Sequence, residues 1–427
     1  MKKQLLLFML LACYQLLLAQ KDILPKMSAG FPVNFDEDSV GNYTLPDLLT
    51  LTNGQKVSSA KIWNEERRPE LLKLVESIQY GKMAAAPKTL RYHVFEESKI
   101  TMNGKAVREQ VTIYFTKDTT GHKMNLLIYL PISTKPVPLL LNISFVANNQ
   151  SVDDPAVKMG RMWTKEGEHL RADKPGRFGK MNVEQFIDAG IGFATVYYGD
   201  IEPDFKAGVK YGIRSQYLKP GQTKPADDEW GAISAWAWGL SRAMDYFEKD
   251  KQIDSKRIAV QGASRLGKTV LWTGINDTRF KMVIASISGE GAAAIARRDY
   301  GENIKHITDT SRYYYQFAPN YHSYSTHVND MPIDANVLVA LMAPRPLLLQ
   351  TGNTDYWSDP KGEFLAAIAA EPVYNLFGKK GPGTTTWPEA GDTSLLMNDL
   401  GYYMHNGGHS VLPGDWTLFI QYMKKYL

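Results

Sequence analysis

Residues 256–272, KRIAVQGASRLGKTVLW, carry the strongest structural signal in the chain. A short apolar run, IAV, is followed by small residues around Ser264 and then by a helical pattern that begins at Arg265. A serine on a sharp strand-to-helix turn, with small neighbours that permit the strained backbone, is typical of a nucleophile elbow. The stretch therefore predicts a strand that presents Ser264 at the carboxyl edge of a sheet, with a helix directly behind it.

The same stretch also fits a second pattern. Gly262 to Thr269 spell G-x-x-x-x-G-K-T, the phosphate-cradling loop of nucleotide hydrolases, which likewise lies between a strand and a helix. The elbow pattern is itself incomplete, because Leu266 holds the fifth position of G-x-S-x-G and Gly267 comes one residue later. However, at least three strand-like runs precede the motif, and no later apolar strand ends in an obvious magnesium-binding aspartate. We favour the elbow, with the nucleotide loop and a purely structural turn as alternatives.

Outward from this stretch, strand-like and helical patterns alternate along the chain. Short apolar runs bounded by Pro, Gly or Asn suit buried strands. They occur at residues 90–97, 109–115, 123–131, 138–146, 191–200, 256–262, 280–289 and 345–353. Helical patterns occur at 62–80, which Gly81 ends, at 184–189, at 230–247, from 265 onward and at 415–427. This alternation predicts an α/β fold, a three-layer sandwich around a mostly parallel central sheet.

A serine nucleophile needs a histidine that takes its proton and a carboxylate that orients the histidine. In α/β-hydrolases these residues follow the order serine, acid, histidine along the chain. His409 is the preferred base, because it follows Gly407 and Gly408 in a glycine-rich loop that can reach across the sheet edge. His405, in the same stretch, is expected to be an exposed loop histidine.

Three carboxylates are candidates for the orienting acid. Asp355 follows the late strand at 345–353 and lies nearest its end, so we prefer it. Asp359 precedes a proline, and Asp-Pro commonly opens a turn. Glu290 follows the strand at 280–289 and is the alternative acid, although it also suits a helix N-terminus, where the macrodipole stabilises a carboxylate.

The N-terminal residues are typical of an export signal. Lys2 and Lys3 precede an apolar run over residues 5–19 that is too short for a comfortable membrane span. We predict a signal peptide over 1–19, cleaved after Ala19, an N-terminal arm over 20–60 and one catalytic domain over 61–427. A rival interpretation is a lipoprotein signal with Cys13 as the lipidated residue. No second stretch resembles a membrane span, so the protein is expected in the periplasm or secreted.

Composition excludes several classes of protein. Of 427 residues, 44% are apolar and 22% charged, which is ordinary for a globular protein with a large core. The net charge of +4 and the absence of a clustered basic stripe argue against a nucleic-acid partner. The single cysteine excludes a disulfide scaffold or a Cys-based zinc site, and the histidines lack metal-ligand spacing. We therefore expect no metal and no cofactor.

Beyond the single motif, the chain resembles the glucuronoyl esterases, carbohydrate esterase family 15, and looks most like their bacterial branch. GASRLGK matches the family motif G-C-S-R-x-G-K, and the similarity continues through SGEGAAAIARRDYGE, MPIDANVLVALMAPRP, DYWSDPKGEF, EPVYNLFG and GGHS. It covers roughly residues 60–427. The resemblance implies an α/β-hydrolase that cleaves esters between 4-O-methyl-glucuronic acid on xylan and lignin alcohols.

The resemblance also implies roles for individual residues. Ser264 matches the family's nucleophile and His409 its base. Arg265 matches an arginine that helps to stabilise the oxyanion, to which its backbone N–H already points. Lys268 matches a lysine that contacts the sugar hydroxyls, and Trp357 a tryptophan that lines the uronate pocket.

Two positions depart from the fungal pattern. Ile287 stands immediately before Ser288 and Gly289, where fungal members have the catalytic glutamate, and an isoleucine cannot orient a histidine. Asp355, as in bacterial relatives with an aspartate after the late strand, is therefore the natural acid. Ala263 replaces the motif cysteine, so the disulfide of fungal members is absent.

We therefore expect an exported serine esterase that acts on a uronate-bearing carbohydrate ester. The alternative within enzymes is another exported α/β-hydrolase, such as an acetyl (xylan) esterase or a serine peptidase. A catalytically inactive carbohydrate-binding protein and a nucleotide hydrolase are alternatives from other classes. The set of Ser264, Asp355 and His409 argues against the inactive protein, and a nucleotide-binding assay tests the nucleotide hydrolase.

Overall fold

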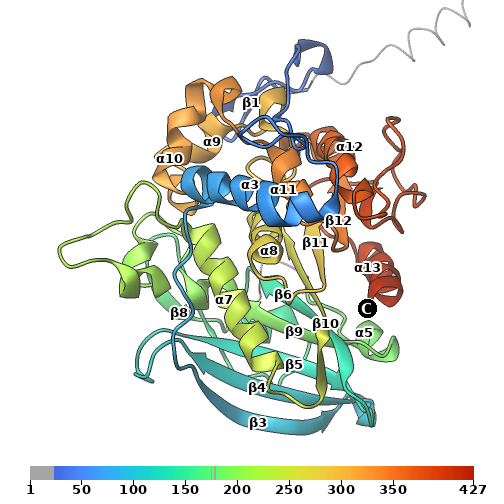
Figure 1. Ribbon diagram of the computed structural model, residues 1–427. Helices are drawn as coiled ribbons and strands as arrows, with labels where there is room; N and C mark the ends of the chain where they lie inside the picture. The colour runs from blue at the N-terminus through green and yellow to red at the C-terminus, as the bar shows by residue number, and fades with distance from the viewer. Residues whose placement is uncertain (1–23, 175, 177–178) are drawn as a thin grey trace, which may run out of the picture.

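A nine-stranded sheet runs through the molecule, in a computed structural model that describes residues 24–174, 176 and 179–427 (Figure 1). The signal peptide predicted at 1–19 lies outside the described residues. The strand order is β13-β12-β11-β10-β6-β9-β5-β4-β3. The strands are β3 (Arg91–Thr101), β4 (Ala106–Tyr114), β5 (Lys123–Pro131), β6 (Val137–Ser144), β9 (Gly192–Tyr197), β10 (Ile253–Ala263), β11 (Met282–Ser286), β12 (Leu347–Gly352) and β13 (Leu400–His405).

The six strands from β13 to β9 are parallel, and β5, β4 and β3 continue the sheet in antiparallel pairs. β6 lies between β9 and β10, so the strand order does not follow the chain order there. The carboxyl ends of parallel strands share one edge of the sheet, and the segments that follow β6, β10, β12 and β13 meet at this edge. The predicted mostly parallel sheet is confirmed.

Helices cover both faces of the sheet, which makes three layers (Figure 1). One apolar cluster packs α3 (Arg68–Val75), α7 (Ala232–Phe247), α8 (Arg265–Asn276), α11 (Ala335–Ala340) and α12 (Pro360–Asn375) against the sheet. A second cluster packs α5 (Glu184–Asp188) and α13 (Pro413–Tyr426) against the other face. The shorter helices are α2 (Ala60–Ile62), α4 (Asn148–Ser151), α6 (Tyr198–Ile201), α9 (Ile304–Thr308) and α10 (Pro319–His322). The predicted α/β-hydrolase sandwich is confirmed.

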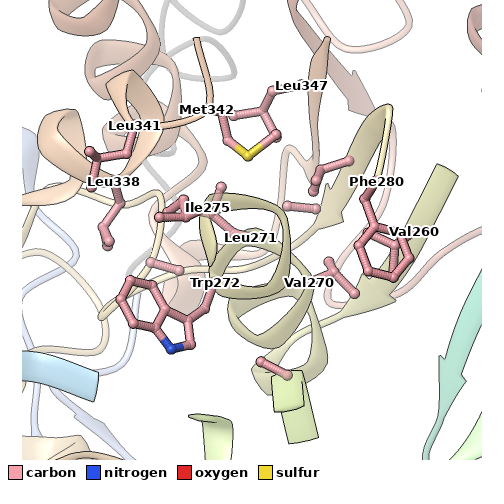
Figure 2. Close-up of a cluster of buried hydrophobic side chains, with 14 of the residues drawn as sticks. Val260, Val270, Leu271, Trp272, Ile275, Phe280, Leu338, Leu341, Met342 and Leu347 are labelled. Carbon is pink, nitrogen blue, oxygen red and sulfur yellow. The ribbon is translucent and has the colours of Figure 1, made fainter. Parts of the chain in front are cut away.

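Helix α8, which follows Ser264, is held by buried apolar side chains along its length (Figure 2). Leu271 and Trp272 are fully buried, and their neighbours in the cluster include Leu338 and Met342 from around α11. Burial of one large apolar side chain contributes about 1.5–3 kcal/mol, so several together anchor the helix firmly. The turn that carries Ser264 is thus fixed between two buried elements, β10 and α8.

The described part of the predicted N-terminal arm packs on the α/β fold. Leu48, Leu51 and Val57 are 3–5% exposed and belong to the larger apolar cluster. Further toward the N-terminus, Glu37 pairs with Arg298 and Lys361. The helical stretch that follows ends at Gly81, as predicted, where φ is 76° and a Cβ would clash with the backbone of Glu229.

The elements that escaped the sequence analysis include one strand of the central sheet, β13, and one long helix, α12. Residues 401–405 were expected to belong to the glycine-rich loop before the last helix, and this was wrong, since they form, with Leu400, a buried strand beside β12. Aromatic residues next to glycine hid the strand pattern. In α12, Gly362 and the internal Pro372 hid the helical pattern.

Candidate active site

Ser264 occupies a strained turn between β10 and α8. Its φ of 59° and ψ of −129° place it in a region that non-glycine residues rarely adopt. Its backbone N–H donates to the Ser286 carbonyl at 2.9 Å. Glycines permit the close approach of the neighbouring segments: a Cβ on Gly262 would clash with the Leu266 carbonyl, and one on Gly267 would lie 2.6 Å from the Ser286 oxygen. This is the geometry of a nucleophile elbow.

His409 and Asp355 come together from two different loops at the same sheet edge. His409 follows β13, and its Nδ1 lies 2.7 Å from Oδ2 of Asp355, which follows β12. The hydroxyl of Ser358 lies 3.1 Å from the same nitrogen. The Asp355 side chain is 3% exposed, whereas that of His409 is 43% exposed. A carboxylate at Nδ1 orients the imidazole and leaves Nε2 available to a nucleophile.

The other two carboxylates serve different partners. Glu290 is buried and accepts a hydrogen bond from the Tyr321 hydroxyl at 3.1 Å. Burial raises the pKa of the Glu290 carboxyl well above its ordinary value. Asp359 accepts from the Gly362 N–H at 2.9 Å and pairs with Arg298 at 2.8 Å, so it caps α12. The structure thus brings Asp355 to His409 and places Glu290 and Asp359 elsewhere.

Ser264 and His409 line one cavity of about 620 Å³. Its wall continues through Ser144, the last residue of β6, and Phe145, which follows it, at a place from which α/β-hydrolases supply an oxyanion donor. The remaining wall is largely apolar and includes Ile287, Val146, Met181, Val411 and Trp416. The cavity has room for a bulky apolar group next to the serine.

The Arg265 side chain is held by an acidic and aromatic cluster. Its Nη1 lies 2.6 Å from Oδ2 of Asp204, and its guanidinium stacks 4.3 Å from the Tyr313 ring. Asp204 also accepts from Tyr315 at 2.9 Å and Gln316 at 2.7 Å. Burial works against the charge, but Asp204 raises the pKa of Arg265 above its ordinary value. The guanidinium is therefore a fixed positive charge one residue from Ser264.

Lys268 and Trp357 have partners of their own. Lys268 is 6% exposed and donates to the Ser288 carbonyl at 2.7 Å. Burial lowers the pKa of its ammonium overall, although the negative charges of Glu302 and Glu290 raise it in part. Trp357 is half-buried, stacks on His306 at 5.4 Å between ring centroids and has the guanidinium of Arg312 5.2 Å from its ring.

Three residues of this region escaped the sequence analysis. They are Arg312, Tyr313 and Asp204. The Tyr313 ring lies 4.3 Å from the guanidinium of Arg265 and 4.9 Å from that of Arg312. Burial raises the pKa of the Tyr313 hydroxyl, but the two guanidiniums lower it overall. Nη1 of Arg312 is buried without a hydrogen-bond partner among the described residues. The cation-aromatic run RYYY, residues 312–315, was the available signal. Asp204 had no such signal.

His405 is the clearest error at the site. It was expected to be an exposed loop histidine, but it ends the buried strand β13 and is 2% exposed. Its Nδ1 lies 2.8 Å from Asp415.

No group of residues suitable for a metal ion occurs in the described part of the chain, and no helix there is long and apolar enough to cross a membrane.

Comparison with known proteins identifies the family. Residues 224–378 match a family model described as glucuronyl esterase, fungi. The chain is 40% identical over 405 residues to carbohydrate esterase MZ0003 from an unknown prokaryotic organism, covering 92% of each chain. It is 33% identical to a 4-O-methyl-glucuronoyl methylesterase of Podospora anserina, covering 87% of this chain and 65% of the relative.

A solved structure agrees with the sequence relatives. The glucuronoyl esterase from Solibacter usitatus is 44% identical and superimposes with a TM-score of 0.86 over 91% of this chain and 99% of that chain. Members of this group are carboxylic ester hydrolases on an α/β-hydrolase fold. The elbow, the histidine and carboxylate loops and these relatives together show that the chain belongs to the glucuronoyl esterases of carbohydrate esterase family 15.

Proposed function

We propose that this protein is a serine esterase that hydrolyses esters of 4-O-methyl-glucuronic or glucuronic acid on glucuronoxylan and releases lignin-type alcohols. The observation that carries the proposal is the hydrogen bond of 2.7 Å between His409 and Asp355, with His409 and Ser264 on one cavity wall. Ser264 is the nucleophile, His409 the base and Asp355 the orienting acid. Glu290, with its raised pKa and its bond to Tyr321, is not part of this set.

The reaction proceeds in two halves. His409 Nε2 takes the proton of Ser264 as the serine oxygen attacks the ester carbonyl. The negative charge on the carbonyl oxygen meets the backbone N–H and the fixed guanidinium of Arg265. His409 then gives the proton to the departing alcohol, and an acyl-enzyme remains. Water attacks it with His409 again as base, which frees the serine and a uronate.

We place the apolar alcohol in the cavity that Ser264 lines, and the uronate acyl group toward the cationic and aromatic side chains that lie near Arg265. Arg312, with its unpartnered Nη1, Trp357 and Lys268 supply cationic and aromatic groups for the sugar and its carboxyl. Trp416, Met181 and Val411 supply an apolar wall for the alcohol. An acetyl esterase needs no cationic and aromatic cluster of this kind, which favours the uronate ester over that alternative.

We also propose that the protein is exported. The support is the basic and apolar pattern of residues 1–19, with cleavage after Ala19 or lipidation at Cys13. The mass of the mature protein separates the two: an N-terminus at Gln20 supports cleavage, and a lipid-bearing N-terminus supports the lipoprotein.

Turnover of benzyl glucuronate, compared with an aryl acetate, tests the function. We expect hydrolysis of the glucuronate ester to be the more efficient, and Ser264→Ala to lose on the order of 10^4-fold or more in kcat, since the serine acts as part of a unit. Circular dichroism confirms that the variant is folded. A folded variant with near-normal activity, or a wild type that hydrolyses only the acetate, would contradict the proposal.

A further inference from the structure

The buried histidine His405 links the loop that carries His409 to helix α13. Its Nδ1 lies 2.8 Å from Oδ2 of Asp415, in the first turn of α13. Its Nε2 lies 3.1 Å from the carbonyl oxygen of Gly408, the residue directly before His409. One imidazole ring therefore contacts both a fixed helix and the peptide that leads into the predicted base.

The rest of this loop depends on few contacts. The N–H of Gly407 donates to Asn353 at 2.9 Å, and the Gly407 carbonyl accepts from Thr354 at 3.1 Å. The Gly408 carbonyl accepts from Ser410, within the loop itself, and from His405. Two successive glycines leave the backbone free to turn, because they have no side chains that could pack. Among the described residues, His405 is thus the side chain that contacts the Gly408 carbonyl, next to His409.

We propose that His405 is a positioning residue, held as an imidazolium that donates from Nε2 to the Gly408 carbonyl and from Nδ1 to Asp415, and that this fixes His409 for catalysis. The effect on catalysis rests on the proposed function. The protonation state and the two hydrogen bonds do not.

The partners decide the protonation state. A carbonyl oxygen can only accept, so Nε2 carries a proton. Oδ2 of Asp415 already accepts from the N–H of Leu412 at 2.8 Å, as an ionised carboxylate does, so Nδ1 also carries a proton. The alternative is a neutral ring whose Nδ1 accepts from Nε2 of Gln350, 3.0 Å away, since this amide nitrogen has a second hydrogen besides the one that it donates to the Thr351 carbonyl. With the Gln350 amide turned over, its Oε1, which otherwise has no hydrogen-bond partner among the described residues, accepts from a protonated Nδ1 instead.

The charged groups around the ring favour the cation. Asp415 from α13 and Asp355 from the segment after β12 face it, and both are acidic. Burial lowers the pKa of His405, but Asp415, the Gly408 carbonyl and Asp355 raise it overall above its ordinary value. The hydrogen bond from Nδ1 is thus fully present below the ordinary pKa of histidine and is lost as the pH rises through the raised one.

Nitrogen-15 NMR of the full-length protein tests the protonation state without any substrate. We expect both ring nitrogens of His405 to show the shifts of a protonated imidazolium at pH 7. The signals are assigned by their loss in His405→Gln, or by their shift in Asp415→Asn if the first variant does not fold. The shifts of a neutral ring with a proton on Nε2 alone would overturn the proposal.

Kinetics on the glucuronate ester test the positioning role. We expect His405→Gln to lower kcat roughly 10- to 100-fold with KM within about threefold, as expected when a catalytic group is misplaced. The matched control is His122→Gln, which removes a half-buried ring bonded to Ser215 on another loop and should leave kcat unchanged. Equal kcat in the two variants would overturn the proposal.

The pH profile separates positioning from a merely structural role. In the wild type, kcat should fall at high pH as His405 loses its proton. Asp415→Asn removes the charge that holds this proton, so the fall should move to lower pH. An unmoved profile would contradict the proposal. If the wild type shows no esterase activity while NMR shows the imidazolium, the proposed function fails and the assigned state of His405 stands.

Discussion

Asp355 and Glu290 are both buried acids near the carboxyl edge of the sheet, but their surroundings give them opposite chemistry. Asp355 has His409 2.7 Å away, where under the proposed mechanism a carboxylate would stabilise the imidazolium that forms. Burial raises the pKa of Glu290 well above its ordinary value, and its partner is a tyrosine hydroxyl. A carboxyl that keeps its proton cannot stabilise an imidazolium as a carboxylate does.

This difference predicts unequal effects of two isosteric substitutions. Asp355→Asn should lower kcat on the order of 10^4-fold, because the amide no longer holds the imidazole in the productive tautomer. Glu290→Gln should lower kcat much less, since the amide oxygen can still accept from Tyr321. The measurement is kcat on the glucuronate ester, with folding checked by thermal unfolding. A larger loss in Glu290→Gln would move the role of the acid to Glu290.

The strand β10, the turn at Ser264 and helix α8 work as one element. α8 is anchored by fully buried side chains such as Leu271 and Trp272, and the turn approaches β11 through Gly267. The strained backbone at Ser264 persists because these neighbours hold both ends of the turn. The glycines are needed because backbone atoms of the neighbouring segments lie too close to leave room for a Cβ. Backbone atoms cannot move aside as the end of a flexible side chain can.

Adding one methyl group inside this element should therefore be costly. In Gly262→Ala the new Cβ meets the Leu266 carbonyl, and overpacking of this kind costs about 1–3 kcal/mol of stability. We expect a lower thermal midpoint and a lower kcat, because α8 must shift and carry Ser264 with it. The control is Gly121→Ala, where the nearest atoms are 3.5 Å away. Equal midpoints for the two variants would contradict this account of the elbow.

Across the whole molecule, several carboxyls are buried with raised pKa values. Burial raises the pKa of Glu363 to about 8, of Glu202 to about 7, and of Asp359 and Asp200 to about 6. In each case burial makes the protonated form more favourable in the folded state than in the unfolded chain. Its contribution to stability is present below the ordinary pKa and is lost as the pH rises through the raised one.

We therefore expect the thermal midpoint to be highest near pH 5 and to fall toward pH 8. Glu363 is fully buried, so it contributes on the order of a few kcal/mol to this loss, and Glu363→Gln should flatten the slope. Glu166→Gln, in an exposed turn, is the control and should leave the slope unchanged. Calorimetry from pH 4 to 9 gives the measurement, and a midpoint that rises from pH 5 to 8 would contradict the prediction.

The sequence by itself determined the class of fold and most of its elements. Apolar runs predicted eight of the strands, since the period of a pattern reports which faces are buried. The elbow at Ser264 was also local, because the small residues that permit the turn are neighbours in the chain. The positions of Asp355 and His409 were predictable from the order of strands and from glycines beside the histidine.

The tertiary structure alone decided which side chains meet. Asp355 and His409 are 54 positions apart, and they come together because β12 and β13 are adjacent parallel strands whose carboxyl ends share one edge. The burial of His405 and the pairing of Arg265 with Asp204 likewise depend on segments distant in the chain. A local pattern cannot report such contacts, because it carries the period of one element and no information on which strand or loop lies beside it.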